Sequence, residues 1–389
     1  MKNSFITFFK VVFISLFSFL FAGGKLVALY VVPEGKSIFL KSPVLNDINW
    51  TSTDDSIATV SEDGVALALK SGLTKINAIK NNEIISSYEI KVVKPEFIKY
   101  IYTEPNNVYK NSYVTFFSIT SNNVSKVKFI IKFNDEYNEF ISTDKKLDGN
   151  NFIYCSDFKV PNCNEFLLEI NYYDNEVWHD SLINKKITVS KDSSCTDTTL
   201  NYKKISTDGI NFIKSYEGFK SEFGKDSIAK NETFDIGYGH VIKFGETFYN
   251  KITQNEAHAK LLDKINNSTY TKEINEFLIS NNIKFNQHQF DALVSFTYNL
   301  GTSWIKNSNL KDIILECKDK SLNEIDKQNF TEKLLKYHHC GKICYKGLLY
   351  RRIDELEIFF FNDYKRDGNL NKNKFTIPEC IINSYGKFI

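Results

Sequence analysis

The sequence predicts a multidomain protein in which two all-β sandwiches precede a mainly helical α+β domain. Three observations support this fold class. A chain of 389 residues is too long for one small core and favours two or three domains. Short runs of alternating apolar and polar residues extend to about residue 190, whereas a helical period of about 3.6 begins near residue 205. Hydrophobic residues make up 42% of the chain and aromatic residues 15%, which is enough for several cores.

The segment 1–24 is typical of a secretory signal. Lys2 and Lys10 are followed by an apolar run over 11–22, and small residues follow up to Gly24. The run is shorter than the roughly 20 residues that span a bilayer. We therefore expect a secreted, extracellular protein with no stable membrane insertion after signal cleavage; the alternative is an uncleaved anchor.

The net charge of +2 does not indicate a polyanion-binding protein. The C-terminal half is mildly basic, which suits an anionic cell-wall polymer but is too weak to imply nucleic-acid binding. We expect a monomer that binds no nucleic acid.

Seven cysteines in an exported chain predict disulfide bonds with one thiol left over. Cys155 and Cys163 lie on either side of a Pro-Asn turn and could close a local loop. Cys340 and Cys344 bracket three residues and form a second candidate pair.

A zinc site is the alternative use of the second cysteine pair. It would combine Cys340 and Cys344 with His338 and His339. These ligands are crowded into one short segment and no matching second pair exists, so the sequence predicts no metal and no cofactor.

Residues 25–95 alternate as half-buried strands do, with a tight turn expected at Asp63-Gly64. The spelling "W-x-S-x-D-x-S-I-A-T-V-x-x-x-G-V … G-x-x-x-I-x-A" starts at Trp50 and resembles the bacterial Ig-like module of intimin-type surface proteins. The resemblance implies a small β-sandwich, with Trp50, Ile57 and Val60 in the core rather than in a sugar-stacking platform.

Residues 96–190 predict a second, Ig-like β-sandwich. Its strands are expected within 113–117, 126–131, 166–173 and 186–189. Its aromatic residues either pack internally or form a face that binds a wall or surface glycan: Tyr109, Phe133, Tyr172 and Trp178. A polar linker over 191–204 follows.

Residues 205–362 read as the helical domain, and the tail 363–389 has no interpretation. Ser206 can cap the first helix, and Thr253 with Glu256 forms a capping box that opens another. Further helical patterns cover 287–300 and 346–361.

Five motifs follow one another in this domain. They are "I-S-x-x-G-x-x-x-I-K-x-Y-E-G-F" (205–219), "D-I-G-Y-G-H" (235–240), "I-T-Q-x-E-A" (252–257), "N-Q-x-Q-F-D-A-L-V-S-F-x-Y-N-L-G" (286–301) and "G-L-L-Y-R-R-x-x-E-x-x-x-F" (347–359). In this order they resemble the phage-type lysozymes (endolysins, glycoside hydrolase family 24) over about 205–360.

Glu217 is the candidate general acid. It ends a predicted helix, where the negative end of the helix dipole and partial burial beside Tyr216 and Phe219 are expected to raise its pKa. A protonated carboxyl can then protonate a glycosidic oxygen.

The resemblance implies that Asp226, nine positions after Glu217, stabilises positive charge on the sugar and helps to hold the attacking water. The family's usual Thr before Ile-Gly-Tyr-Gly-His is replaced by Asp235. Thr233 would lie on the same strand face as Asp235. Three alternatives stay open: Asp235 is the base for the water, Thr233 assists, or activity is reduced.

Supporting roles are expected for five more residues. His240 is predicted to support the fold rather than take part in catalysis. Gln289 and Asn299 flank the helix that would line the groove, and Asn299 matches a substrate-contacting position of the family. Arg351 or Arg352 is expected to pair with Glu217 or Asp226, and the other to bond the helix framework.

The implied function is that of a secreted muramidase. It would cut the β-1,4 bond between N-acetylmuramic acid and N-acetylglucosamine in peptidoglycan, with inversion, as an antimicrobial or wall-degrading hydrolase. The alternatives are a catalytically impaired wall-binding protein, a chitinase, and an adhesin in which the sandwiches do the main work.

Overall fold

The computed structural model describes residues 20–22, 25–44, 47–134, 136–190, 202–225, 233–267, 269–306, 308–318, 320–321, 325–340 and 343–368. Most of the predicted signal, linker and tail lies outside these residues. Among the helices that are described, none combines the length and the apolar composition that a membrane crossing requires.

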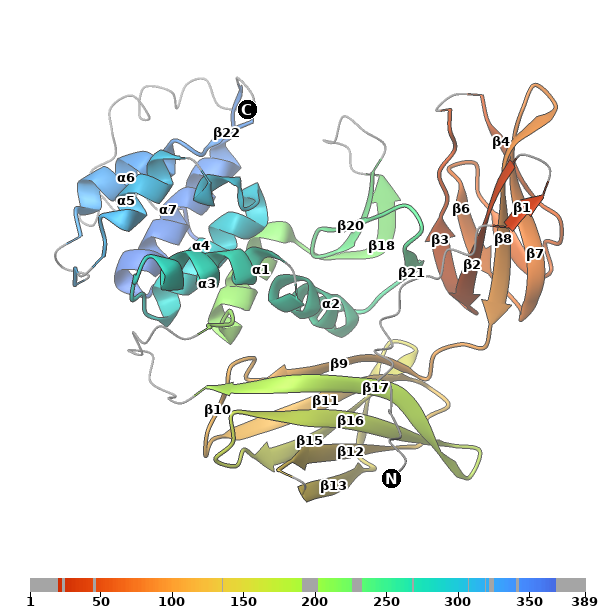
Figure 1. The fold of residues 1–389 in the computed structure, drawn as a ribbon, viewed down its shortest axis with the longest axis horizontal. Helices are drawn as coiled ribbons and strands as arrows, with labels where there is room; N and C mark the ends of the chain where they lie inside the picture. Colours follow the sequence, from red (N-terminus) through yellow and green to blue (C-terminus); the bar gives the residue numbers. More distant parts are fainter. Residues whose placement is uncertain are drawn as a thin grey trace, which may run out of the picture. The chain divides into compact units, whose positions relative to one another are not determined.

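The chain forms two compact units, and each takes residues from separate parts of the sequence. Unit 1 combines residues 1–96 with 222–236 and 241–252, and unit 2 combines 97–221 with 237–240 and 253–389. Up to Ser190 the described regular structure is β-strand, and the α-helices α1 to α7 follow from Thr207 onwards (Figure 1). The predicted fold class is confirmed in this respect.

Unit 1 contains two sheets. The first has the order β1-β2-β8-β7-β4, formed by Leu20–Ala22, Lys25–Pro33, Glu83–Val93, Gly72–Lys80 and Asn49–Ser52. The second has the order β21-β3-β6-β5, formed by Thr247–Tyr249, Lys36–Phe39, Val65–Ala68 and Ala58–Val60. Buried residues alternate along β7, as a sheet with one covered face requires. Trp50, Ile57 and Val60 pack against the core, as predicted, and Gly64 makes the expected turn with φ of 79°.

Strand β21 is the element of unit 1 that the sequence does not predict. It pairs antiparallel with β3, so that Phe248 lies opposite Ser37. The backbone N–H of Gly245 donates to the carbonyl of Phe39 at 2.7 Å. The Phe39 and Phe244 rings stack with centroids 4.2 Å apart. Residues far apart in sequence therefore complete the second sheet.

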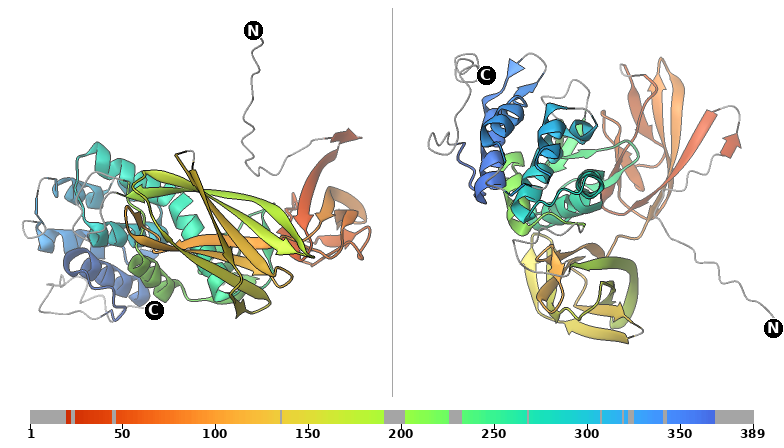
Figure 2. Two further views of the ribbon diagram at one scale, coloured as in Figure 1. Left: turned by 90° about the horizontal axis from the view of Figure 1, so that it is seen from below. Right: turned by 60° about the vertical axis from the view of Figure 1, so that its left-hand side comes forward.

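Unit 2 begins with the second predicted sandwich (Figure 2). One sheet has the order β10-β17-β16-β12-β13, formed by Val108–Tyr109, Val177–Ser190, Glu165–Asp174, Lys126–Phe133 and Glu136–Ser142. The other has the order β14-β15-β11-β9, formed by Lys145–Asp148, Asn151–Lys159, Tyr113–Ser121 and Ile98–Glu104. Phe133 and Tyr172 pack against the core between the sheets, which is the structural role that the sequence left open for them.

The helical part of unit 2 carries the candidate site. Its helices are α1 Thr207–Glu217, α2 Gln254–Asn267, α3 Thr269–Ser280, α4 Gln287–Leu300, η1 Ser303–Ile305, α5 Asn309–Leu315, α6 Lys327–Leu335 and α7 Lys346–Phe361. Ser206 caps α1 by accepting from the N–H of Gly209, as predicted. The capping box before α2 is also present, because the N–H of Thr253 donates to Glu256 at 2.8 Å and the N–H of Glu256 donates to the Thr253 hydroxyl at 3.1 Å.

Two small β elements remain. A three-stranded sheet has the order β18-β19-β20, formed by Lys220–Lys225, Phe234–Gly237 and His240–Ile242, and most of its residues belong to unit 1. A two-stranded ribbon, β22 His339–Cys340 and β23 Ile343–Cys344, lies between α6 and α7 in the sequence. The ribbon lies in the segment that contains His339, Cys340 and Cys344.

Polar contacts tie the second sandwich to the helices within unit 2. The Asn106 side-chain amide donates to the Ile205 carbonyl at 2.7 Å, and both groups are buried. The Thr253 hydroxyl donates to Asp148 at 2.6 Å. These contacts are part of why residues 97–221 and 253–389 form one unit.

The predicted local disulfides are wrong for the described cysteines. Cys155 and Cys163 are free thiols, because Cys155 is exposed on β15 whereas Cys163 is buried in the sandwich core. Cys344 is also free and lies opposite His339 in the ribbon, while Cys340 lies opposite Ile343. A short sequence separation does not suffice for a disulfide, because the two cysteine side chains must also point towards each other.

Candidate active site

Glu217 is the last residue of α1. The helix ends there because Gly218 has φ of 70°, a left-handed conformation that glycine adopts at little cost, and its N–H returns to the carbonyl of Lys214. The Glu217 side chain is 20% exposed. The carboxyl therefore emerges at the C-terminus of the helix and keeps access to solvent, as the sequence predicted.

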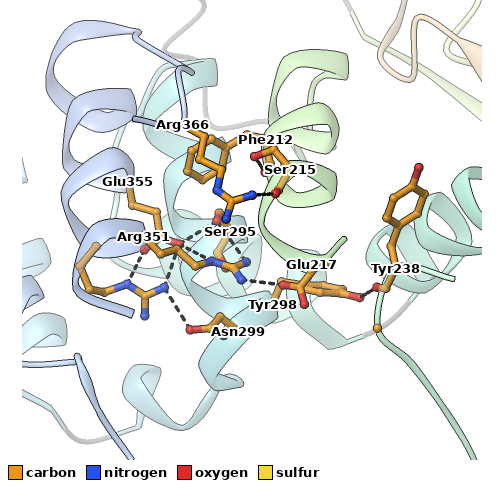
Figure 3. A network of polar contacts seen from close by, with 12 residues as sticks. Phe212, Ser215, Glu217, Tyr238, Ser295, Tyr298, Asn299, Arg351, Glu355 and Arg366 are labelled. Atoms are coloured by element: carbon orange, nitrogen blue, oxygen red, sulfur yellow. Dashed lines mark hydrogen bonds and ion pairs between the residues drawn. The ribbon is translucent and has the colours of Figure 1, made fainter. Parts of the chain in front are cut away.

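Arg351 holds one oxygen of this carboxyl. Its Nη1 lies 2.6 Å from Oε1 of Glu217, and the arginine side chain is 4% exposed (Figure 3). The remaining nitrogens of the fork are also engaged, since Nε lies 3.3 Å from Oε1 of Glu355 and Nη2 donates to the Ser295 carbonyl at 3.3 Å. A planar guanidinium bound at three places fixes the carboxyl that it contacts.

Arg352 belongs to the framework rather than to Glu217. Its Nε lies 2.7 Å from Oε2 of Glu355, and its Nη2 donates to Glu355 at 3.0 Å and to the Asn299 side-chain oxygen at 3.1 Å. Arg352 is 0% exposed and Glu355 is 1% exposed. Burial lowers the pKa of Arg352 to about 10, although the Glu355 charge opposes the shift. The structure thus resolves the two arginine roles that the sequence left open.

The turn Gly237–His240 lies against the other oxygen of Glu217. Gly239 has φ of 71°, and a Cβ placed there would lie 3.2 Å from Oε2 of Glu217. Two hydrogen bonds fix the turn. The Tyr298 hydroxyl donates to the Tyr238 carbonyl at 2.7 Å (Figure 3), and Lys264 donates to the Gly239 carbonyl at 3.1 Å. A glycine is therefore required here both by the backbone and by the approach of the carboxyl.

Tyr298 is fixed as a hydrogen-bond donor in this arrangement. Burial raises its pKa above the ordinary value, and the nearby charge of Glu217 raises it further. The neutral hydroxyl keeps its proton and donates a hydrogen bond to the Tyr238 carbonyl. This hydrogen bond therefore persists across the physiological pH range.

Replacing Gly239 with Ala is expected to lower catalytic activity, because the added methyl would displace the Glu217 carboxyl by a few tenths of an ångström. The loss should stay below the roughly 100-fold that a misplacement of about 1 Å can cost. The strained φ should also lower the free energy of unfolding by about 1–2 kcal/mol. Wall lysis and urea unfolding measure the two effects.

Gly301 offers a matched control, since it has φ of 79° and no atom lies within 4 Å of a Cβ placed there. Gly301→Ala should lose similar stability and keep its activity. Equal losses of activity in the two variants would contradict the role assigned to the contact between Gly239 and Glu217.

The remaining predicted residues are placed as follows. Thr233 and Asp235 are half-buried and alternate with the buried Phe234 and Ile236, so they share one face at β19 as predicted. Asp226 lies outside the described residues. His240 is half-buried and follows the turn on β20.

Gln289 lies in the first turn of α4, the helix that it was expected to flank. It is 4% exposed, and its side chain accepts from the N–H of Asn286 at 3.0 Å, while Asn286 accepts from the N–H of Gln289. Gln289 therefore closes the capping box of α4, which is a supporting role in the helix framework.

Three residues of the network were not singled out from the sequence. Glu355 follows Arg351 by four positions, and this spacing on a helix is the signal that could have indicated the pair. Ser295 donates to Glu355 at 2.7 Å from the neighbouring helix α4. Ser295 and Tyr298 belong to the quoted 286–301 motif, but the motif does not reveal their partners Glu355 and Tyr238, which come from other segments.

The family model described as Phage lysozyme matches residues 214–355. This segment is similar to the phage lysozyme family. It contains Glu217, Arg351, Arg352 and Glu355, so the geometry described above belongs to the matched part of the chain. The predicted resemblance is confirmed.

Curated relatives include two phage endolysins. The endolysin of Bacillus phage B103 is 31% identical over 163 residues, which are 41% of this chain and 56% of the relative. The endolysin of Lactococcus phage c2 is 30% identical over 173 residues, 44% of this chain and 66% of the relative. The chain therefore spans about half to two thirds of the length of these relatives.

Two solved structures are among those similar to this chain. An endolysin from Escherichia coli O157:H7 phage FAHEc1 is 26% identical, covers 42% of this chain and 98% of its own, and has a TM-score of 0.32. The FN1–FN3 domains of chicken CNTN1 are 10% identical, cover 41% of this chain and 62% of their own, and have a TM-score of 0.20.

Proposed function

We propose that this protein is a secreted muramidase that hydrolyses β-1,4 bonds between N-acetylmuramic acid and N-acetylglucosamine in peptidoglycan. One observation supports this most strongly. Within a phage lysozyme domain, Glu217 ends a helix with one carboxyl oxygen held by Arg351 and the other beside the Gly239 turn. A glycosidase needs such a fixed acid that still has access to solvent.

The proposed reaction is a single displacement. Glu217 gives its proton to the glycosidic oxygen as the bond from that oxygen to the anomeric carbon breaks. A water molecule attacks the anomeric carbon from the opposite face and loses its proton to a carboxylate. Arg351 positions Glu217 throughout, since it is bound to Glu355 and Ser295 as well.

Asp226 and Asp235 are the carboxylates proposed to act in the reaction together with Glu217. The resemblance assigns Asp226 to the stabilisation of positive charge on the sugar. Asp235 stands where the family has Thr, and a carboxylate can accept the proton of the attacking water. Thr233 shares its strand face and can help to position that water. The two sandwiches would space or tether the enzyme at a wall glycan.

Analysis of the products tests this function. Purified peptidoglycan treated with the full chain should gain new reducing ends that carry N-acetylmuramic acid. Release of reducing ends from chitin oligomers but not from peptidoglycan would favour a chitinase. Binding to the wall without any new reducing end would favour an impaired binding protein.

Asp235→Asn is expected to lower the rate of peptidoglycan hydrolysis by about 10²-fold, the lower range of a general base. Asp235→Thr restores the residue that is usual in the family and should keep more activity than Asn, because its hydroxyl can position water. Rates of reducing-end release measure the effect, and Glu316→Gln is the control, because Glu316 is an exposed carboxylate at the C-terminal end of α5. Full activity of Asp235→Asn would remove Asp235 from the mechanism.

A further inference from the structure

The ribbon β22–β23 brings together three side chains that bind soft metal ions. His338, His339 and Cys344 each contribute one ligand atom, and these atoms all lie within 4.8 Å of one another. His338 is buried, Cys344 is half-buried and His339 is exposed. The cluster is therefore reachable from solvent at one side and enclosed at the other.

The backbone register accounts for this convergence. His339 of β22 lies directly opposite Cys344 of β23. The N–H of Tyr345 donates to the carbonyl of His338 at 3.0 Å, which ties the residue before the ribbon to the residue after it. The two imidazole rings lie side by side, with centroids 3.9 Å apart. The hairpin thus gathers residues that are six positions apart in the sequence.

Second contacts orient both histidines. Nδ1 of His338 contacts the Leu335 carbonyl, and Nδ1 of His339 contacts the Lys336 carbonyl at 3.4 Å. A carbonyl oxygen can only accept, so a neutral ring in this contact carries its proton on Nδ1 and its lone pair on Nε2. A histidine whose Nδ1–H donates to a backbone carbonyl is the common arrangement of metal ligands.

We propose that His338, His339 and Cys344 bind a single Zn²⁺ ion. Two imidazoles and one thiolate suit zinc, which takes nitrogen at about 2.0–2.1 Å and sulfur at about 2.3 Å in a tetrahedron. Those bond lengths separate the ligand atoms by about 3.3–3.8 Å. The described cluster reaches this geometry when its side chains close by about 1 Å.

The fourth tetrahedral position falls to a water molecule. This inference revises the sequence-based expectation of a metal-free chain. The spacing of the ligands looked too crowded for zinc, but a tight hairpin folds the segment back so that His339 and Cys344 become neighbours.

A metal ion at this site would restrain the position of the start of helix α7. The ribbon ends two residues before α7, which contributes Arg351, Arg352 and Glu355 to the candidate active site. A metal at the ribbon would hold the connection from α6 to α7 in one conformation. The ion would be structural, and it is separate from the proposed reaction at Glu217.

Zinc binding to the full chain tests the proposal. Protein purified with a reductant and stripped with a chelator should take up one Zn²⁺ per chain when titrated against a chromophoric competitor. His339→Gln and Cys344→Ser should each weaken binding at least tenfold, because each removes a ligand at a position that is not fully buried. Cobalt(II) should give a thiolate-to-metal charge-transfer band that Cys344→Ser abolishes.

Two matched variants serve as controls. Cys155→Ser removes an exposed free thiol on β15, and His179→Gln removes a half-buried histidine on β17. Both should bind zinc and cobalt as the unmodified chain does. The proposal is overturned if the unmodified chain binds no stoichiometric zinc, if Cys344→Ser and His339→Gln bind as tightly as the controls, or if peptide mapping without reductant finds Cys344 in a disulfide.

Discussion

Glu217→Gln is expected to reduce the rate of peptidoglycan hydrolysis by about 10³-fold, within the range of 10²–10⁴ for a general acid. Gln keeps the shape of the side chain and one oxygen that can accept from Arg351, but it has no proton to give to the leaving oxygen. The loss should appear in kcat rather than in KM, because the group acts in the transition state. Initial rates of reducing-end release measure it.

Glu316→Gln is the matched control for this substitution. Glu316 is exposed at the end of α5, so the same chemical change there should leave the rate unchanged. Circular dichroism of both variants verifies that the helices are intact. Equal rates for Glu217→Gln and the unmodified chain would exclude Glu217 as the proton donor.

Glu355→Gln should have the largest effect on stability, lowering the free energy of unfolding by about 3–5 kcal/mol. The substitution removes the negative charge between two buried cations, since Glu355 lies 3.3 Å from Arg351 and 2.7 Å from Arg352. Both arginines are less than a twentieth exposed, so water cannot replace the lost partner. Urea unfolding followed by helical circular dichroism measures the change, because the described α-helices all lie within 207–361.

An exposed ion pair provides the comparison. Glu222 and Lys251 lie 3.0 Å apart with side chains 65% and 74% exposed, so Glu222→Gln should leave the unfolding midpoint unchanged. The double variant Glu355→Gln with Arg352→Met should lose less than the sum of the single losses, since the two residues are in contact. A loss below about 1 kcal/mol in Glu355→Gln would show that the buried network is not held by charge.

Local signals made much of this architecture predictable. Ser206 and Thr253 cap helices because a hydroxyl there accepts backbone N–H groups, which depends on the neighbouring residues alone. The end of α1 at Glu217 follows from Gly218 in the same way. The order of β-rich and helical segments was predictable because periods of two and 3.6 residues are local properties.

Contacts between distant segments were not predictable. The choice of Arg351 over Arg352 as the partner of Glu217 depends on the rotation of α7 against α1, which neighbouring residues do not reveal. The sequence left open whether Gln289 binds substrate or supports the helix, because the same amide that can bind a sugar also caps a helix. The prediction of a Cys155–Cys163 disulfide failed because Cys155 is exposed on β15 whereas Cys163 is buried in the core, and sequence separation does not reveal that difference.

The pairing of β21 with β3 has a consequence for experiments on the first module. A fragment ending at residue 96 would lack Thr247–Tyr249, and the backbone groups of Lys36, Ser37 and Ile38 on that side would lose their neighbour. An uncovered sheet margin readily recruits another chain. We therefore expect the excised module to self-associate through the exposed edge of β3. A fragment that keeps this edge paired would need residues 244–249 fused to it in the same chain.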